Sequence, residues 1–538
     1  MESAMLWRLL AKINFVTSAL ILAVPAYTVH AADLKIGFKA EVTSADPHVL
    51  NGNNRNVWVH VYESLVAQDE NLKAKPALAT SWRNVDSTTW EFKLRPNVTF
   101  HNGATMTAED VKFSIERAMN LSGPRTFRTY LKAVQSVTVT GPGTVTIKTK
   151  GPSPTLPDSL GLIAILPKTI GDKASEEDFA TGKTTFGTGP YKFVSWAHGQ
   201  RVSLAKNSAY WGEKEPWDNV TFQFIPREPA RASALLSGSV DLIDAATANV
   251  MDSFKSSNKI DVVSTTSYML NYLQLDRFRD NSPYLKSNEG APLAKNPFND
   301  IKVRQALMAA VNREGIVNRL MKGDAEAASQ FVPAGFFGND PALKVPAHDL
   351  AKAKALLAEA GYPNGFRMTM HCSNDRYLND AKVCEALGQV FSQIGIKTEV
   401  ATMPFAVYAG RATAGGASGE PEFSLFMFGI GAVTGDSLEP LLAVAHSHDK
   451  AAGLGANNRG RYSSKEVDAL VIKASVTMNE KAREDLQKAA AKAVIDDVGI
   501  VPLFFLKSTW AYRKGLTVKP RSDGFTLAMG IRESSSAK

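Results

Sequence analysis

The sequence predicts an α/β protein of several lobes, and three observations support this class. From Asp349 onward, short apolar runs alternate with amphipathic helical runs, which predicts a mainly parallel sheet covered on both faces. Earlier in the chain, Val134–Thr149 consists of two β-branched runs around Gly-Pro-Gly, which predicts an antiparallel hairpin. The 538 residues are too many for one compact core and suit two or three lobes.

The first 31 residues are expected to be an export signal that precedes the fold. Arg8 and Lys12 form a basic flank, residues 15–24 form a short apolar run, and residues 29–31 fit a small-residue cleavage site. A transmembrane anchor fits less well, because a span needs roughly 20 apolar residues. No cysteine lies near the cleavage point, which excludes lipid attachment there. The mature chain should start at Ala32 in an exported compartment, most simply a Gram-negative periplasm.

The stretch from Trp90 to Met119 predicts a β-β-α unit. Residues 90–94 alternate between large apolar and charged side chains, which is the period of a half-buried strand. After a Pro-Asn turn, residues 98–100 are expected to form a second short strand. Thr107 lies three residues before Asp110, the spacing of a capping box, and the helix that follows has apolar residues every fourth position.

This unit also carries a resemblance to a known family. The pattern W-x-F-x-L-R-x-x-V-x-F-H-x-G followed by T-A-x-D-V-x-F-S closely resembles the signature of the family 5 solute-binding proteins of bacterial ABC importers. That family includes dipeptide, oligopeptide, nickel and glutathione binders. The block at 301–313 and Gly-Thr-Gly-Pro-Tyr at 187–191 are similar to family segments as well.

The resemblance implies a periplasmic binding protein-like class II fold, with two α/β lobes joined by a hinge and an extra α+β domain. The implied ranges are 32–65, 187–272 and 499–533 for lobe I, 66–186 for lobe II and 273–498 for lobe III. The turn at 187–191 should return the chain from lobe II to lobe I. We expect Gly187 and Gly189 to supply the positive φ that such a turn needs.

Local patterns predict most of the other elements. Asp300 should cap a helix, residues 156–166 form an apolar run, and the polar stretch 173–183 is expected to be disordered. Further helices are expected at 57–65, 229–238, 350–360, 378–394, 405–414, 438–445, 465–476 and 480–496. Further strands are expected at 33–38, 192–196, 240–243, 268–276, 366–371, 396–401, 423–428 and 500–506.

Asp436 is the main candidate for ligand binding. Residues 435–440 (G-D-S-L-E-P) resemble the D-x-x-E/D-P segment of the peptide binders, whose aspartate accepts the α-ammonium of the ligand. A cation enclosed in a closed cleft needs such a partner. Asp436 also precedes an expected helix and can cap its first amides, and both roles can hold together. Peptide binders have a tryptophan three residues earlier, whereas Val433 stands here, which argues against an ordinary dipeptide ligand.

Four further residues are candidates for lining the cleft. Arg376 follows an expected strand near the place where dipeptide binders have a carboxylate-binding arginine, and a bidentate guanidinium suits a carboxylate or phosphate. A surface ion pair with a neighbouring aspartate is the alternative. Tyr377 and Arg411 are included as lining residues. His48 is included because residues 46–48 (D-P-H) resemble a loop near the cleft of the family.

Other motifs do not predict catalysis or a metal. The glycine loop at 429–435 lacks dinucleotide-binding spacing, and two histidines at i and i+2 within 446–449 do not face one metal. The S-x-x-K match at 203–206 lacks the partner motifs of acyl enzymes. Cys372 ends an expected strand and Cys384 lies in the next helix, so a disulfide and two buried thiols both stay open.

The net charge of +8 is spread along the chain without a basic stripe, so no nucleic-acid binding is predicted. The sequence therefore predicts a monomeric solute-binding protein without catalytic activity, metal or cofactor. It should close by hinge motion on a short peptide or peptide-like solute and deliver it to an inner-membrane ABC permease. The alternatives are a non-peptide solute (an opine, sugar conjugate, metal chelate or haem) and an exported hydrolase.

Overall fold

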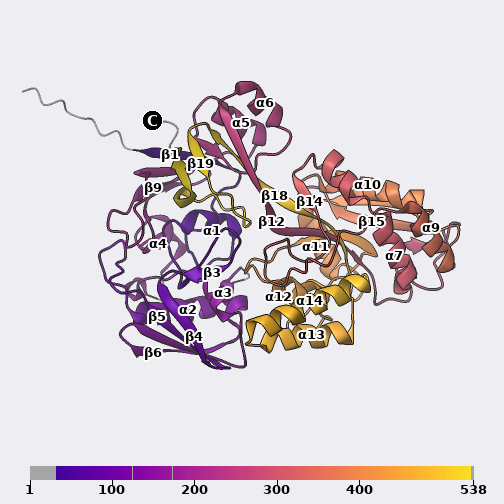
Figure 1. Cartoon of the computed structure of the whole chain (residues 1–538), viewed down its shortest axis with the longest axis horizontal. Coiled ribbons are helices and arrows are strands. Elements are labelled where there is room, and N and C mark those ends of the chain that lie inside the picture. The colour runs from indigo at the N-terminus through magenta and orange to yellow at the C-terminus, as the bar shows by residue number, and fades with distance from the viewer. Residues whose placement is uncertain (1–31, 124, 172–173, 535–538) are drawn as a thin grey trace, which may run out of the picture.

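The computed structural model describes residues 32–123, 125–171 and 174–534, so the predicted signal peptide at 1–31 lies outside the described residues. Figure 1 shows two halves joined by two long strands, β12 (Ile260–Leu275) and β18 (Val501–Arg513). These strands pair antiparallel from Ile260 opposite Arg513 to Leu273 opposite Val501. They belong to one sheet of order β13-β15-β17-β12-β18-β11-β1-β10-β9-β8, which therefore runs through both halves.

We use the predicted ranges as names for the three lobes. Lobe I is built around a buried core that includes Trp58, Trp217 and Trp510. Strand β1 pairs parallel with β10 and β11, whereas β9 and β8 continue the sheet antiparallel. The elements of lobe I are β1 (Asp33–Phe38), α1 (Gly52–Trp58), β8 (Tyr191–Ala197), β9 (Arg201–Lys206), β10 (Asn219–Phe224), α5 (Glu228–Leu236), β11 (Leu242–Ile243), α6 (Met251–Ser257), β19 (Leu516–Val518), η6 (Ala528–Gly530) and β20 (Ile531–Glu533).

Lobe II is an antiparallel sheet of order β4-β5-β7-β6 covered by helix α2. The capping box between Thr107 and Asp110 is confirmed at the start of α2, and so is the predicted hairpin β6–β7. The elements of lobe II are β2 (Val66–Gln68), β3 (Ala74–Pro76), β4 (Ala79–Asp86), β5 (Thr89–Leu94), α2 (Ala108–Asn120), η1 (Phe127–Leu131), β6 (Val134–Gly141), β7 (Thr144–Thr149), α3 (Leu156–Leu160), η2 (Lys168–Ile170) and α4 (Glu176–Ala180).

Lobe III carries the alternation predicted from Asp349 onward: β15 pairs parallel with both β16 and β17. Cys372 on β15 and Cys384 on α10 form a disulfide, which decides between the two alternatives. The elements of lobe III are β13 (Leu285–Lys286), η3 (Pro297–Asn299), α7 (Ile301–Ala310), α8 (Arg313–Gly315), η4 (Ile316–Leu320), β14 (Ala325–Ala327), α9 (Leu350–Glu359), β15 (Arg367–Ser373), α10 (Asp380–Gln393), β16 (Lys397–Met403), α11 (Phe405–Ala414), β17 (Leu425–Ile430), α12 (Leu438–Pro440), η5 (Leu441–Ala445), α13 (Lys465–Val476) and α14 (Glu480–Asp496).

Three local predictions are wrong. The helix expected at 57–65 is instead α1, which begins at Gly52 because Asn51 caps it, and ends at Trp58. Residues 98–100 form only an isolated bridge from Thr99 to Thr105, because the chain turns at once. Within 173–183, expected to be disordered, α4 forms because Ser175 and a carboxylate three residues later satisfy its first amides.

The prediction of positive φ for Gly187 and Gly189 is also wrong, since neither adopts it. The two residues must be glycine for a different reason. A Cβ on Gly187 would lie 1.8 Å from the Val61 carbonyl oxygen, and one on Gly189 would lie 2.5 Å from the His60 carbonyl oxygen. Backbone therefore packs directly against backbone where the chain returns from lobe II to lobe I.

Candidate functional site

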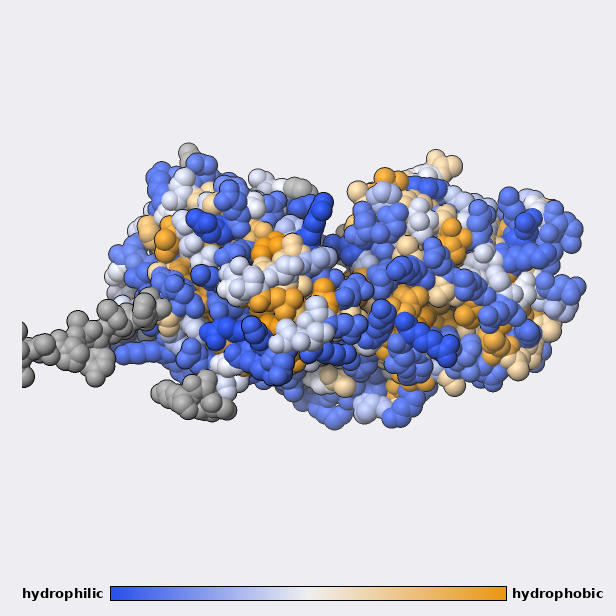
Figure 2. Space-filling view, turned by 90° about the horizontal axis from the view of Figure 1, so that it is seen from above, coloured by the Kyte–Doolittle hydropathy of each residue, from blue (hydrophilic) through white to orange (hydrophobic). Residues whose placement is uncertain are grey.

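The seam between lobe III and the other two lobes is the first candidate for a ligand site. Figure 2 shows the surface hollowed between the two halves of the molecule. Inside the seam, the Gln68 amide donates to the Val433 carbonyl oxygen at 2.9 Å, and the Tyr130 hydroxyl donates to Glu439 at 3.1 Å. Carboxyl ends of parallel strands are common ligand sites in α/β sheets, and the Val433 loop follows the carboxyl end of β17.

Asp436 lies at this seam and is 4 % exposed. Its Oδ1 accepts from the Leu438 amide at 2.8 Å, so the capping role is present at the start of α12. Its Oδ2 lies 3.7 Å from the Arg483 guanidinium, which the sequence analysis did not anticipate. Burial raises the pKa of Asp436, and the positive charge of Arg483 opposes that rise.

Two further acids lie near Asp436: Asp158 across the seam, and Glu439 on the same lobe as Asp436. Asp158 of lobe II has its pKa raised to about 7 by burial and by the charge of Asp436. Burial likewise raises the pKa of Glu439 to about 7, against the hydrogen bonds from Thr434 and Tyr130. Among the described residues, Arg483 is the cation that lies beside Asp436. The seam therefore carries three carboxyl groups whose pKa burial raises.

Arg376 and Tyr377 follow the carboxyl end of β15. The Tyr377 hydroxyl accepts from the Gly429 amide at 2.9 Å, which ties this segment to the end of β17. The Arg376 guanidinium lies 5.0 Å from the centre of the Phe405 ring and 5.9 Å from that of Tyr377. Within the described residues it forms no ion pair with a carboxylate, so the alternative of a surface pair with Asp375 or Asp380 is not seen.

The other two predicted residues lie elsewhere. Arg411 is ion-paired with Glu422 and bonded to the Tyr284 hydroxyl at 3.2 Å. It is six residues along α11 from Phe405, roughly 9 Å toward the opposite end of the sheet. His48 is completely buried, with its Nε2 2.8 Å from the Ala164 carbonyl oxygen. The structure thus groups Arg376 with Tyr377 and separates both from Arg411 and His48.

His48 belongs to a buried ionic cluster between lobes I and II. The Arg117 guanidinium donates to both oxygens of Asp46, at 2.6 and 3.0 Å, and to Nδ1 of His48 at 3.0 Å. Burial lowers the pKa of His48 to about 4, so the ring is neutral at pH 7 and can accept from Arg117. Because both charges are removed from water and paired, this cluster fixes helix α2 against the loop at 46–48.

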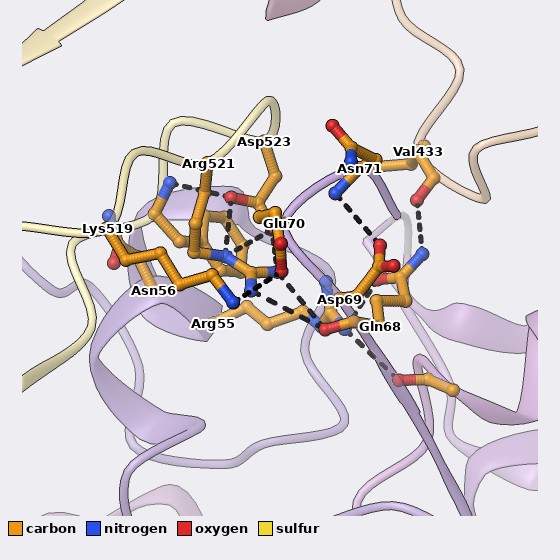
Figure 3. A network of polar contacts seen from close by, with 12 residues as sticks. Arg55, Asn56, Gln68, Asp69, Glu70, Asn71, Val433, Lys519, Arg521 and Asp523 are labelled. Carbon is orange, nitrogen blue, oxygen red and sulfur yellow. Dashed lines mark hydrogen bonds and ion pairs between the residues drawn. The ribbon is translucent and has the colours of Figure 1, made fainter. Parts of the chain in front are cut away.

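A cavity of about 740 Å³ forms a second candidate site, and it lies between lobes I and II. None of the five predicted residues lines it. Figure 3 shows part of its wall, where Arg521 pairs with Asp523 at 2.7 Å and Lys519 pairs with Glu70 at 2.9 Å. The wall also contains Glu63, whose pKa burial raises to about 7.

The sequence analysis missed the residues of this cavity. Glu63 accepts hydrogen bonds from the Thr188 hydroxyl at 2.8 Å and from Tyr210 and Trp211 at 2.9 Å. Arg55 of α1 lines the cavity as well. A charged residue on an amphipathic helix normally faces water, so no pattern in the sequence marks Arg55 as internal.

Two structural findings concern metals and membranes. Among the described residues, no group of three or more His, Cys, Asp or Glu side chains is arranged to hold a metal ion. In that same part of the chain, no helix combines the length and the apolar character that a membrane crossing requires.

Two paired crossover strands join the two halves of the molecule, and acidic side chains line the seam between these halves. This arrangement is that of a binding protein. Residues 73–452 match the model of the bacterial extracellular solute-binding proteins, family 5, so the chain belongs to that family. It is therefore the solute-binding component of an ABC importer and not an enzyme, and the predicted fold class is confirmed.

Named relatives span nearly the whole chain. The glutathione-binding protein GsiB of Pectobacterium atrosepticum is 28% identical over 502 residues, covering 91% of each chain. Heme-binding protein A of Haemophilus influenzae is 27% identical and covers 86% of this chain and 85% of its own. The Helicobacter pylori periplasmic binding protein DppA, solved with the peptide STSA, is 26% identical with a TM-score of 0.73, covering 94% of this chain and 98% of that one.

Proposed function

We propose that the chain captures a short peptide or peptide-like solute in the seam between lobe III and lobes I and II. The observation that carries this proposal is that a cationic side chain and an acidic side chain follow neighbouring strands at one edge of the lobe III sheet. Arg376 offers a guanidinium that has no carboxylate partner among the described residues, and the Tyr377 hydroxyl ties its segment to β17. Asp436 follows on the loop after β17. A cation and an acid on neighbouring loops suit the two charged ends of a peptide.

The cellular setting follows from the same proposal. Residues 1–31 direct the chain to the periplasm and are removed there, and the mature protein acts as a monomer. Two of the named relatives are a glutathione binder and a binding protein solved with a tetrapeptide. Both support a peptide-like cargo, which an inner-membrane permease would receive from the closed form.

The test is the affinity of Asp436→Asn for aminated peptides, measured by calorimetry. Asparagine still accepts from the Leu438 amide, so the cap is kept while the charge is lost. We expect affinity for a free-amine peptide to fall at least about tenfold, or about 1.4 kcal/mol, with N-acetylated peptide unaffected. The matched control is Asp349→Asn, the cap of α9, whose Oδ1 accepts from the Lys352 amide at 2.8 Å. An unchanged dissociation constant in Asp436→Asn would leave only the capping role.

A second candidate is a non-peptide solute such as an opine, sugar conjugate, metal chelate or haem. Val433 favours it, because the tryptophan of peptide binders is absent and the Val433 carbonyl is already bonded to Gln68. Native mass spectrometry of protein purified without denaturation separates the two candidates by the mass of what co-purifies. A haem or a metal chelate in that spectrum would replace the peptide assignment.

A further inference from the structure

The cavity between lobes I and II contains a guanidinium that forms no ion pair in the part of the chain that the structure describes. Arg55 projects from α1 and donates to the Gly161 carbonyl oxygen at 3.1 Å and to Oε1 of Gln68 at 3.3 Å. It also lies 5.4 Å from the centre of the Phe525 ring. No ion pair joins it to a carboxylate within the described residues. Burial lowers the pKa of Arg55, with Asp523 the largest opposing charge.

The other charges of the cavity wall are largely compensated, which isolates Arg55. Three cations of the wall are paired with acids of the same wall: Arg521 with Asp523, Lys519 with Glu70, and Arg532 with Glu215. Glu63 receives three neutral donors instead of a cation. Lys75 and Glu213 are exposed and in contact with solvent. Arg55 is half-buried, and a charge that is partly removed from water without a paired acid is costly, so an anion bound beside Arg55 would be stabilised.

An unpartnered polar group of the same wall agrees with this. The Nδ2 group of Asn54 has no hydrogen-bond partner in the described part of the chain. Asn54 lines the cavity and is 1 % exposed. Buried donors of this kind are normally satisfied. Asn54 and Arg55 are neighbours in α1 and both line the cavity.

We propose that this cavity is a subsite for an acidic group of the solute, a carboxylate that Arg55 holds with Asn54 as an additional donor. The proposal rests on the proposed function and deepens it, because it makes the cargo an acidic peptide-like solute. The volume of about 740 Å³ lies within the usual range for small-molecule sites, and Trp58 and Phe525 supply apolar wall. Guanidinium is the side chain best suited to a carboxylate.

The subsite is connected to the seam through Gln68. The Gln68 side chain accepts from Arg55 with its oxygen and donates to the Val433 carbonyl oxygen with its nitrogen. Figure 3 shows Gln68 between Arg55 and Val433. A carboxylate on Arg55 therefore competes with the oxygen of a side chain whose nitrogen holds lobe III. The Gln68 amide thus contacts both the proposed solute site and lobe III, so binding of the solute in the cavity and closure of lobe III depend on the same side chain.

The first measurement uses bromide, a simple anion with anomalous scattering, in crystals of the mature chain. We expect an anomalous peak in contact with the Arg55 guanidinium, absent in Arg55→Gln and reduced by added acetate. Inorganic phosphate is tried in parallel, and displacement by phosphate but not acetate would assign the subsite to phosphate. No peak at Arg55 in the wild type would overturn the proposal.

The second measurement compares glutathione with its glycine-carboxylate ethyl ester by calorimetry. We expect Arg55→Gln to weaken the free acid at least tenfold and to leave the ester unchanged. Lys75→Gln, which removes an exposed cation of the same cavity wall, should stay within twofold of the wild type. Arg55→Gln should also keep the wild-type melting temperature, because it removes a half-buried charge that has no paired acid among the described residues.

The outcomes separate the two proposals. A bromide peak with unchanged glutathione affinity in Arg55→Gln means an adventitious ion only, and the subsite assignment fails. If the wild type binds neither glutathione and its ester nor the free-amine peptides of the Asp436 test, the peptide assignment fails, and the bromide and acetate results alone decide the anion subsite. Loss of free-acid binding in Arg55→Gln with Asp436→Asn still unaffected would keep the subsite and remove the ammonium partner.

Discussion

Replacing Glu439 by glutamine should make lobe closure less sensitive to pH. Glu439 lies on lobe III and accepts from Tyr130 of lobe II, so closing the seam removes its carboxyl group from water. Burial at the bridged seam raises its pKa from 4.5 to about 7. The closed form therefore binds more protons than an open form with an ordinary carboxyl group, and closure is favoured at low pH and weakened as pH rises from 4.5 to 7.

The magnitude follows from 1.36 kcal/mol for each tenfold change in acidity. Burying the ionised Glu439 costs about 3 kcal/mol at about pH 8 and about 1.4 kcal/mol at about pH 5.5, so closure loses about 2 kcal/mol across this range. Glutamine removes that cost but satisfies one fewer donor among Thr434 and Tyr130, a loss of about 1 kcal/mol. The net gain for closure is therefore about 2 kcal/mol at about pH 8 and near zero at about pH 5.5.

Small-angle X-ray scattering of ligand-free protein measures this shift directly. The wild type should expand between about pH 5.5 and pH 8 as the closed-to-open ratio falls roughly thirtyfold. Glu439→Gln should stay more compact at the higher pH. The pKa of Asp158 is raised in the same direction. The size of the double variant with Asp158→Asn should therefore depend even less on pH. Arg483 and Asp436 influence the pKa of Asp158, and Arg55 and Tyr268 influence that of Tyr130. These four residues are therefore kept unchanged in the variants.

Glu484→Gln is the matched control, because Glu484 pairs with Lys488 on the same helix and is not at the seam contacts described above. It should reproduce the wild-type profile. A Glu439→Gln profile parallel to the wild type over the whole pH range would refute the link between this carboxyl group and closure.

Three further predictions concern stability. Removing the disulfide with Cys372→Ala and Cys384→Ala should cost about 3 kcal/mol in urea unfolding, since the bridge closes a loop with a sequence separation of 12, and dithiothreitol should have no further effect on the variant. Gly187→Ala should cost about 3 kcal/mol or more because its Cβ would overlap the Val61 carbonyl, whereas Gly52→Ala meets nothing within 4 Å and should be near neutral. Arg117→Gln should cost about 3–5 kcal/mol because it leaves Asp46 buried and unpaired, and a melting temperature equal to the wild type would contradict that role for the pair.

Helices with strong local signals were predictable from the sequence to the residue. The predicted ranges 405–414, 465–476 and 480–496 are the bounds of α11, α13 and α14. Pro404 precedes the first, and the Ser464 and Asn479 side chains cap the other two. Each boundary is decided by a neighbouring residue in the sequence, so local reading suffices.

Elements that depend on distant contacts were predicted less well. Strand β12 was expected at 268–276 but begins at Ile260, because its first half pairs with β18 far along the chain. The glycines at 187 and 189 were recognised as necessary, but the reason was wrong. Their constraint is the approach of the carbonyls at 60 and 61, which no local conformational rule contains.

The candidate site residues also fall into those predictable from local sequence and those that depend on distant contacts. Arg376 and Tyr377 could be placed together from the sequence because they adjoin the end of one strand. Arg411 was grouped with them by residue type alone. Its ion pair with Glu422 at the other end of the sheet was not visible. Asp436 was assigned two roles, and the cap is present in the structure while its neighbour Arg483 comes from α14, 47 positions later.

Arg55 could not be identified from the sequence for a reason that applies to buried charges in general. A sequence shows that a residue is charged but not whether an opposite charge lies within reach. Asp523 is close to Arg521 in the sequence, but the partners of Lys519 and Arg532 become apparent only when residues 70 and 215 are brought to the same wall. Once those pairs are formed, the remaining charge is the informative one, because among the described residues Arg55 is held by neutral acceptors and not by a paired acid. The residue most relevant to the chemistry of the cargo is thus defined by the partners that its neighbours have and it lacks.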